Sequence, residues 1–308
     1  MNRREEMKNK HVTMRDVAKE AGVSVATVSY VLNYSETEKI SHETRWRVFE
    51  AVNKLKYIPS VKSKAVTSKK SFLVGIINIG EDNKKSKLYQ YYDLIREMEQ
   101  VLNKIGYDVI LIQTMEMLQN IVIDKRRSLD AVFIIDMKEE DSKEITKYFV
   151  VPVIFVDTYV KEPLFCKILT DWEDVLKKGR EQLGEDYYVI LEDYSNKYCL
   201  KSILKTVDVQ NVFINEDSES LIEFLKKHKE KKGLVIGEIL GMQVENYVDN
   251  RNLVVVVNSD KDIMLLPDTK ICVVSNELKA KKIVEVMNKL LKLENTYEID
   301  EITYIKSL

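Results

Sequence analysis

The chain has 308 residues, of which 45% are hydrophobic, and its formal net charge is −2. This composition is that of a globular protein with room for two or more domains. The longest uncharged apolar run, Tyr148 to Val156, has about nine residues, too few for the roughly 20 of a membrane-spanning helix. Because the opening residues MNRREEMKNK lack the apolar core of a signal peptide, we expect a cytoplasmic protein with no membrane partner.

Sequence motifs for catalysis or metal binding are missing. The chain contains no GxGxxG, no Walker loop, no GxSxG and no histidine pair at metal-binding spacing. Cys166, Cys199 and Cys272 form an odd number without a CxxC pair, which is typical of free thiols in a reducing compartment. We therefore expect no enzyme, no metal site and no cofactor.

Charge is distributed unevenly along the chain. Residues 1–70 carry 15 lysines and arginines against 8 aspartates and glutamates, a net charge of +7. The remaining residues, 71–308, carry 33 against 42, a net charge of −9. A basic segment on an acidic body indicates that only this segment meets a polyanion such as DNA. A disordered basic tail is the alternative, and regular apolar spacing within the segment argues against it.

The first predicted helix follows Thr13. Thr13 and Asp16 have the spacing of a capping box, which satisfies the free backbone groups at a helix start. Val17, Ala18 and Ala21 then fall on one apolar stripe. Gly22 supplies a residue that adopts the left-handed conformation at low cost, so we expect the helix to end there.

A second and a third helix are predicted after this glycine. Ser24 is placed to cap the second helix, whose apolar face holds Val28, Val31 and Leu32. Ser41 is placed to cap the third. Two short helices joined by three residues around a glycine predict a helix-turn-helix. A small helical subdomain without a nucleic-acid role would share this pattern, but the basic charge favours DNA binding.

From Ser71 onward, apolar strand-like runs alternate with charged amphipathic segments. This alternation predicts an α/β fold with parallel sheets, and about 238 residues suit two subdomains better than one sheet. The predicted strands are 72–80, 108–114, 130–136, 152–157, 186–193, 211–215, 233–240, 252–257, 270–275 and 301–307. The predicted helices are 89–106, 141–149, 171–183, 197–207, 217–229 and 276–293.

The amino-terminal segment matches a family pattern in one register. VTMRDVAKEAGVSVATVSYVLN (12–33) and ISHETRWRVFEAVNKLKYIP (40–59) resemble the headpiece of the LacI/GalR family of bacterial transcription regulators, with its pattern T-x-x-D-V-A-x-x-A-G-V-S-x-x-T-V-S-R-V-L-N. The resemblance implies a small all-α helix-turn-helix headpiece (11–59), a hinge segment (60–70) and an effector-binding and dimerisation core (71–308). It implies that the core is a two-subdomain α/β structure similar to periplasmic binding proteins. On this resemblance the chain crosses between subdomains near Asp157 and again near Ser275.

The resemblance also implies which residues meet DNA. The hydroxyl and amide side chains of the helix after Ser24 suit phosphate contacts, which position a protein without reading sequence. Val25 and Ala26 occupy the variable base-reading places, where apolar side chains can touch a thymine methyl group. Tyr30 replaces the family's usual arginine and either contacts a base or packs on the headpiece surface. The residues assigned to DNA are Thr13, Met14, Ser24, Val25, Ala26, Thr27, Ser29, Tyr30, Asn33, Lys62 and Val66.

Two of these residues belong to the hinge segment. The family has a short helix here that pushes a leucine into the minor groove, and this chain has Val66 at that place. Valine is a smaller wedge, so we expect it to kink DNA less. Lys62 keeps the segment basic. A plain flexible linker is the alternative reading of this segment.

The core departs from the family at the expected ligand site. Trp172 replaces an asparagine after Asp171, Cys199 takes the place of an arginine, and Gly237-Glu238 replaces Asn-Asp. A pocket that lacks the arginine and asparagine loses the groups that would grip a sugar. We expect a more apolar ligand, a cation near Glu238, or none. The candidate effector-site residues are Asp171, Cys199, Gly237, Glu238 and Ser259.

The sequence thus predicts a sequence-specific DNA-binding transcription regulator. We expect a homodimeric repressor that binds a near-palindromic double-stranded DNA operator, with an atypical or absent small-molecule effector. A solute-binding protein of transport is the alternative from another class, since the core alone resembles one. A cytosolic enzyme on a doubly wound fold is a further alternative that no motif supports.

Overall fold

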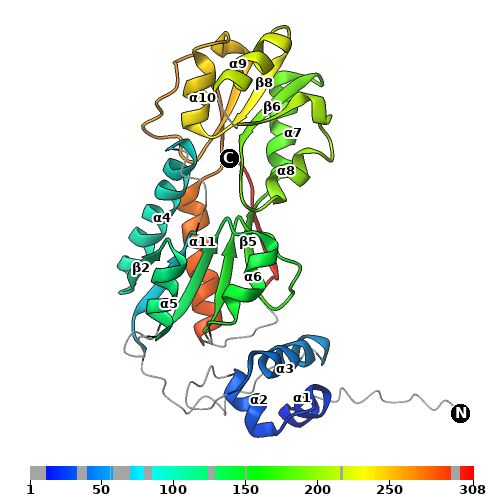
Figure 1. The fold of residues 1–308 in the computed structure, drawn as a ribbon, viewed down its shortest axis with the longest axis vertical. Helices are drawn as coiled ribbons and strands as arrows, with labels where there is room; N and C mark the ends of the chain where they lie inside the picture. The colour runs from blue at the N-terminus through cyan, green and yellow to red at the C-terminus, as the bar shows by residue number, and fades with distance from the viewer. Residues whose placement is uncertain are drawn as a thin grey trace, which may run out of the picture. The chain divides into compact units, whose positions relative to one another are not determined.

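The computed structural model consists of two compact units, which are described separately: the amino-terminal helices and the α/β core (Figure 1). It describes residues 12–32, 40–55, 57, 70–79, 85–123, 129–149, 151–215, 218–292 and 299–308. Three of the predicted DNA-contact residues, Asn33, Lys62 and Val66, lie outside these ranges. Within them, no helix combines the length and the apolar character that crossing a bilayer requires.

The amino-terminal unit contains the predicted helices, α1 (Met14–Ala21), α2 (Val25–Leu32) and α3 (His42–Leu55). The capping box forms as expected, with the Thr13 backbone N–H donating to Asp16 Oδ2 at 2.8 Å and the Asp16 N–H donating to Thr13 Oγ1 at 3.4 Å. Gly22 ends α1 with φ 63° and ψ 40°, the left-handed conformation that glycine adopts without steric cost.

Apolar side chains from these helices form a small core. Val17, Val28, Val31 and Val48 are fully buried, and Tyr57 closes the cluster after α3. Each such side chain contributes roughly 1.5–3 kcal/mol by leaving water. The unit therefore folds on a core of its own and leaves the opposite face of α2 outside it.

The first subdomain of the core is built on a fully parallel sheet with the strand order β11-β5-β4-β3-β1-β2. Its strands are β1 (Leu73–Ile77), β2 (Asp108–Ile112), β3 (Ala131–Ile135), β4 (Val153–Val156), β5 (Cys166–Thr170) and β11 (Ile302–Ile305). Its helices are α4 (Lys85–Lys104), α5 (Met115–Ile123), α6 (Glu139–Thr146) and α11 (Asn276–Lys292).

The second subdomain has a parallel sheet with the order β10-β9-β8-β6-β7. Its strands are β6 (Tyr187–Glu192), β7 (Val212–Asn215), β8 (Lys232–Ile236), β9 (Leu253–Val257) and β10 (Lys270–Val273). Its helices are α7 (Trp172–Leu183), α8 (Tyr198–Ile203), α9 (Ser218–Lys227) and α10 (Glu238–Glu245), with 3-10 turns at Val209–Asn211 and Asn250–Asn252.

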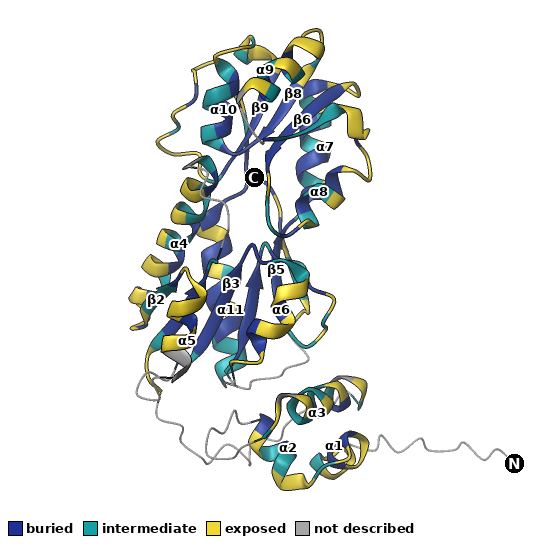
Figure 2. Cartoon of the chain, viewed as in Figure 1, coloured by how far each residue is buried: buried dark blue, intermediate teal, exposed yellow. Residues whose placement is uncertain are grey.

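Both sheets lie inside their subdomains, and the outer helix faces meet solvent (Figure 2). Strands β3, β4, β6 and β9 are buried at every position, which explains why their sequences are nearly continuous apolar runs. This is the pattern expected of parallel strands that helices cover on both faces. The carboxyl ends of the strands are left to build the site between the subdomains.

The first crossing between subdomains differs from the prediction. The chain was expected to leave the first subdomain near Asp157, but β5 pairs with β4 in the same sheet, with Ile154 opposite Cys166. The chain therefore crosses after Thr170, where α7 begins. The second crossing lies near Ser275 as expected, between β10 and α11. The end of the chain returns once more, since the Leu308 N–H donates to the Val273 carbonyl at 2.8 Å.

Other sequence predictions missed elements or ran past their ends. Helix α5 and strand β5 were not predicted, because both are short and lack a clear flanking turn signal. The run 233–240 was predicted as one strand, but β8 ends at Ile236. Gly237 adopts φ 107° and opens α10 at Glu238 instead. The glycine inside this apolar run was the sequence signal for the break.

Candidate functional site

Helix α2 presents two chemically different faces. Val28, Val31 and Leu32 are buried in the headpiece core, whereas Val25 and Tyr30 keep 41% and 38% of their surface exposed. Ala26 is exposed beside them. The outward face carries no acidic or basic residue, so it can approach a duplex without charge repulsion and can offer apolar contacts to base edges.

Hydroxyl groups gather at the amino end of α2. Ser24 Oγ accepts a hydrogen bond from the Thr27 N–H at 3.0 Å, and the two side-chain hydroxyls lie 2.9 Å apart. Ser24 is exposed, while Thr27 and Ser29 are half-buried. A helix start with free N–H groups and small hydroxyls is suited to a phosphate oxygen.

The other predicted contact residues lie at the start of α1. Thr13 is exposed, and its hydroxyl donates to Asp16 Oδ2 at 2.7 Å within the capping box. Met14 is half-buried and packs against the headpiece core. The structure thus brings Thr13, Met14 and the α2 residues onto one small domain, and it gives Thr13 and Met14 structural roles as well.

One basic side chain near α2 escaped the sequence reasoning. Arg47 on α3 is exposed, and its guanidinium lies beside the α1–α2 turn, where a Cβ built on Gly22 would be 3.8 Å from Arg47 Nη1. Arg47 also donates to Thr44 Oγ1 at 3.5 Å. Its place depends on how α3 packs against α1, which no local pattern reveals. Lys54, by contrast, is paired with Glu20 at 2.5 Å.

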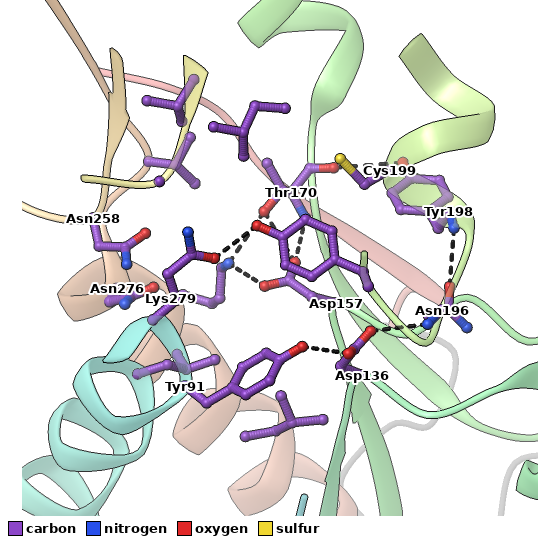
Figure 3. A pocket seen from close by; sticks show the side chains of 18 of the residues that line it. Tyr91, Asp136, Asp157, Thr170, Asn196, Tyr198, Cys199, Asn258, Asn276 and Lys279 are labelled. Atoms are coloured by element: carbon purple, nitrogen blue, oxygen red, sulfur yellow. Dashed lines mark hydrogen bonds and ion pairs between the residues drawn. The ribbon is translucent and has the colours of Figure 1, made fainter. Parts of the chain in front are cut away.

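The core site forms where strands β3 and β4 end in aspartates with left-handed backbones. Asp136 has φ 49° and accepts hydrogen bonds from the Tyr91 hydroxyl and from the N–H groups of Ser195 and Asn196, at 3.0 and 2.9 Å for the latter two (Figure 3). Lys87 Nζ lies 3.4 Å from Asp136 Oδ2, and both side chains are almost fully buried. Asp136 is therefore a buried charge whose acceptor capacity is used.

Asp157 forms a second network. It has φ 46°, forms an ion pair with Lys279 of α11, and accepts from the backbone and the hydroxyl of Thr170 at 3.0 and 2.9 Å (Figure 3). Lys279 also donates to Thr170 Oγ1 at 3.1 Å. Its side chain is only 4% exposed, so it is a buried, paired cation.

A small cavity of about 80 Å³ lies between the two subdomains at these strand ends. Of the candidate effector residues, Cys199 and Gly237 line it. Three others lie next to lining residues and hold local structure. Asp171 caps α7 by accepting from the Asp174 N–H at 3.1 Å, Glu238 Oε1 accepts from the Met264 N–H at 2.7 Å, and Ser259 Oγ accepts from the Lys261 N–H at 3.1 Å.

Burial controls the chemistry of the cavity. It raises the pKa of the Cys199 thiol well above its ordinary value, and the charges of Asp157 and Asp136 act in the same direction. Burial likewise raises the pKa of the Tyr91 and Tyr194 hydroxyls well above the ordinary value. Cys199 is thus a protonated, weakly polar wall, and both tyrosines are neutral donors at physiological pH.

Sequence reasoning missed the charged residues of this site. The runs FIID and IFVD each place an aspartate directly after a buried strand, at Asp136 and Asp157, and that was a usable signal. Tyr91 and Lys279 come from helices far apart in the chain, so only the folded arrangement shows that they share the site.

Comparisons with known proteins agree with this arrangement. The family model for bacterial regulatory proteins of the lacI family matches residues 13–60. The transcriptional regulator RegA of Clostridium saccharobutylicum is 24% identical over 95% of this chain and 96% of its own length. Catabolite control protein A of Staphylococcus aureus is 26% identical over 86% of this chain and 74% of its own.

A solved structure supports the fold over nearly the whole chain. It is the lac repressor dimer bound to operator and the anti-inducer ONPF, with a TM-score of 0.58, 16% identity and coverage of 97% of this chain and 98% of that one. The predicted fold class and family resemblance are confirmed, and a transport-type solute-binding protein is not favoured. The chain is therefore a DNA-binding transcription regulator whose residues 13–60 match the lacI family of bacterial regulatory proteins and whose whole length resembles known transcription regulators.

Proposed function

We propose that this regulator represses transcription by binding a near-palindromic double-stranded DNA operator as a homodimer. The observation that carries the proposal is the outward face of α2, an uncharged surface on a basic headpiece. The solved lac repressor structure, a dimer bound to operator, supports this mode of action. A dimer matches the symmetry of a palindrome, because each headpiece meets one half-site.

The homodimer has a candidate surface on the core. Tyr89 and Tyr92 of α4 are 41% and 65% exposed, and Met264 after β9 is 43% exposed. The carboxylate of Glu238 lies near both regions. Burial and then the charge of Glu238 raise the pKa of Tyr89, and Glu238 Oε1 accepts a hydrogen bond from the Met264 N–H. Exposed apolar side chains from both subdomains thus lie along one face, and pairing two copies through it would remove them from water.

The proposal assigns the chain's parts as follows: a headpiece at 11–59, a hinge at 60–70 and a dimerisation core at 71–308. Thr13, Ser24, Thr27 and Ser29 contact phosphates, with Arg47 as an added contact. The protein acts in the cytoplasm, where the operator DNA is. We propose no enzymatic activity. Burial raises the pKa of the Cys199 thiol, which makes this thiol a poor nucleophile.

Operator readout and effector use are both unusual in this proposal. Val25, Ala26 and Tyr30 read the half-site chiefly through apolar contact with thymine methyl groups. The cavity at the strand ends, about 80 Å³, is far below the roughly 300–1,000 Å³ of ordinary ligand pockets, although a wider groove of about 1030 Å³ opens beside it. We therefore propose that a small-molecule effector is atypical or absent.

Selection of genomic fragments that the purified protein retains, followed by binding at several salt concentrations, tests the proposal. If two headpieces each neutralise roughly five phosphates, log K should fall with log salt at a slope of about −9. The control is the same titration with Arg47→Ala, which should reduce the slope by about 2 for the dimer. A slope near zero, or retention of no fragment, contradicts the proposed function.

A further inference from the structure

One short segment of the second subdomain reaches across the cleft to the first. Residues 192–196, at the end of β6, meet the first two turns of α4. The Ser86 hydroxyl donates to Glu192 Oε1 at 2.5 Å, and Lys87 Nζ donates to the Asp193 carbonyl at 2.8 Å. These contacts join α4 of the first subdomain to the end of β6 in the second, so they hold the two subdomains together.

The same segment is held on its other side by the ends of β3 and β4. Asp136 accepts from two of its backbone N–H groups, as described above. The Asn196 carboxamide donates to the carbonyls of Met137 at 2.8 Å and Tyr159 at 3.1 Å, and it accepts from the Tyr159 N–H at 3.1 Å. The segment is therefore bound along its length by complementary polar groups.

Gln90 completes the contact inside the cavity. The Tyr194 hydroxyl donates to Gln90 Oε1 at 2.7 Å. The Gln90 carboxamide lies so close to Gly237 that a Cβ there would be 1.7 Å from Gln90 Nε2. The side chain thus fills the space next to the end of β8, where a ligand in the cleft would otherwise lie.

Most partners in this contact are buried and already satisfied, whereas the buried Gln90 Nε2 has no hydrogen-bond partner among the described residues. Glu192, Lys87 and Asn196 are 1%, 2% and 5% exposed. Glu192 also accepts from Asn215 Nδ2 at 3.2 Å. A ligand could hydrogen-bond to these groups only by displacing their present partners, and separating the subdomains would leave buried polar groups without partners.

We infer that the regulator's core is held closed by its own side chains, through a latch formed by Ser86, Lys87, Gln90 and Asp136 on one subdomain and residues 192–196 on the other. This inference rests on the proposed function, because it concerns how the regulator's effector site is controlled. The latch uses most of the hydrogen-bonding groups at the strand ends and leaves a cavity of about 80 Å³ there, beside a wider groove of about 1030 Å³ lined by Lys87, Met137 and Tyr198 among others. Closure of the core is then independent of a small molecule.

Cys199 provides a reporter for opening of the cleft. It lines the cavity and is 6% exposed, while Cys272 in β10 is 2% exposed and lies outside the cavity lining. The experiment measures alkylation of each thiol by iodoacetamide in the full-length protein, using mass spectrometry to separate the sites. In the wild type we expect Cys199 to react as slowly as Cys272.

Latch variants should change one thiol and leave the other unaffected. Tyr194→Phe should accelerate Cys199 about tenfold, the population change that follows from losing one buried hydrogen bond. Cys272 should stay within about twofold, since a local opening leaves the rest of the fold protected. The matched control is Tyr188→Phe in the preceding strand, β6, whose hydroxyl lies over Gly233 rather than at the cleft. It should change neither rate.

Three results would overturn the latch. The first is a wild-type Cys199 that reacts far faster than Cys272, because the cleft would then be open. The second is an unchanged Cys199 rate in Tyr194→Phe. If that variant accelerates both thiols, Ser86→Ala decides, and equal acceleration of both thiols there is the third result that rejects the inference. Gel shifts on the same samples separate the two proposals, since loss of all DNA binding with the expected thiol rates rejects the function and keeps the latch.

Discussion

The headpiece and the cleft of the core differ in how far their polar groups are exposed to solvent. On the headpiece, Ser24 and Thr13 are exposed beside an uncharged apolar face. In the cleft, Asp136 and Lys87 are buried and paired with groups of the chain itself. The headpiece leaves these hydroxyl groups exposed, whereas the core pairs its polar groups between its own subdomains. Within one regulator, polar groups are thus exposed in one unit, where we propose that they meet DNA, and paired in the other, where we propose that they hold the subdomains closed.

Deleting residues 1–70 should have the largest effect, because it removes the helices that we propose bind DNA. DNA binding should be lost completely, while the core remains a folded dimer. Its polar groups and apolar clusters lie within residues 71–308. Gel shift and size-exclusion chromatography measure the two properties. Binding of operator DNA by the truncated chain would show that the core itself meets DNA.

Asp136→Asn should destabilise the core strongly and leave the headpiece stable. The change keeps the shape of the side chain and suits the left-handed backbone, but it leaves the buried Lys87 ammonium without its carboxylate. Removing one partner of a buried pair costs about 3–5 kcal/mol in the free energy of unfolding. Urea unfolding of a Trp46→Phe background, followed by the fluorescence of Trp172 beside the cavity, measures it.

Asp260→Asn is the control for that measurement, since Asp260 is exposed after β9. It should change the free energy of unfolding by less than about 0.5 kcal/mol. If Asp136→Asn is equally mild, the buried network at the strand ends does not hold the core together.

The same contrast explains how far the sequence could lead. The headpiece was predicted almost to the residue, because capping at Thr13, Gly22 and Ser24 and the stripe of Val17 and Val28 are local signals. The core's alternating strands were predicted as well. The cleft was not, because Tyr91, Asp136 and Lys279 come from separate elements, and their contact depends on where the chain crosses between subdomains. That crossing was itself misplaced, since β5 carries no signal that assigns it to the first sheet.

Tyr30→Arg should change which operator is preferred. An arginine at this exposed place can donate two hydrogen bonds to guanine, which is worth about 1–3 kcal/mol of discrimination. Ser29→Ala is the matched comparison and should weaken all sequences about equally, as a phosphate contact does. Selection of binding sites for each variant measures the change. If the ranking of operators is the same for Tyr30→Arg, Tyr30 only packs on the surface and other residues read the bases.

Sugars should have the smallest effect. An effector shifts DNA affinity only by its differential affinity for the two states of the core. A hexose would have to displace Gln90 and separate the 192–196 segment from α4 before it could use Asp136. We therefore expect hexoses and pentoses to change DNA affinity by less than about threefold, or ~0.7 kcal/mol.

A panel of sugars, sugar phosphates, nucleobases and amino acids tests this expectation, first by thermal shift and then by gel shift. Tyr194→Phe is included as the variant whose cleft should open more easily. A sugar that binds the wild type at micromolar affinity and releases the operator would show that the cleft opens readily, and the contrast between an outward headpiece and a closed core would then fail.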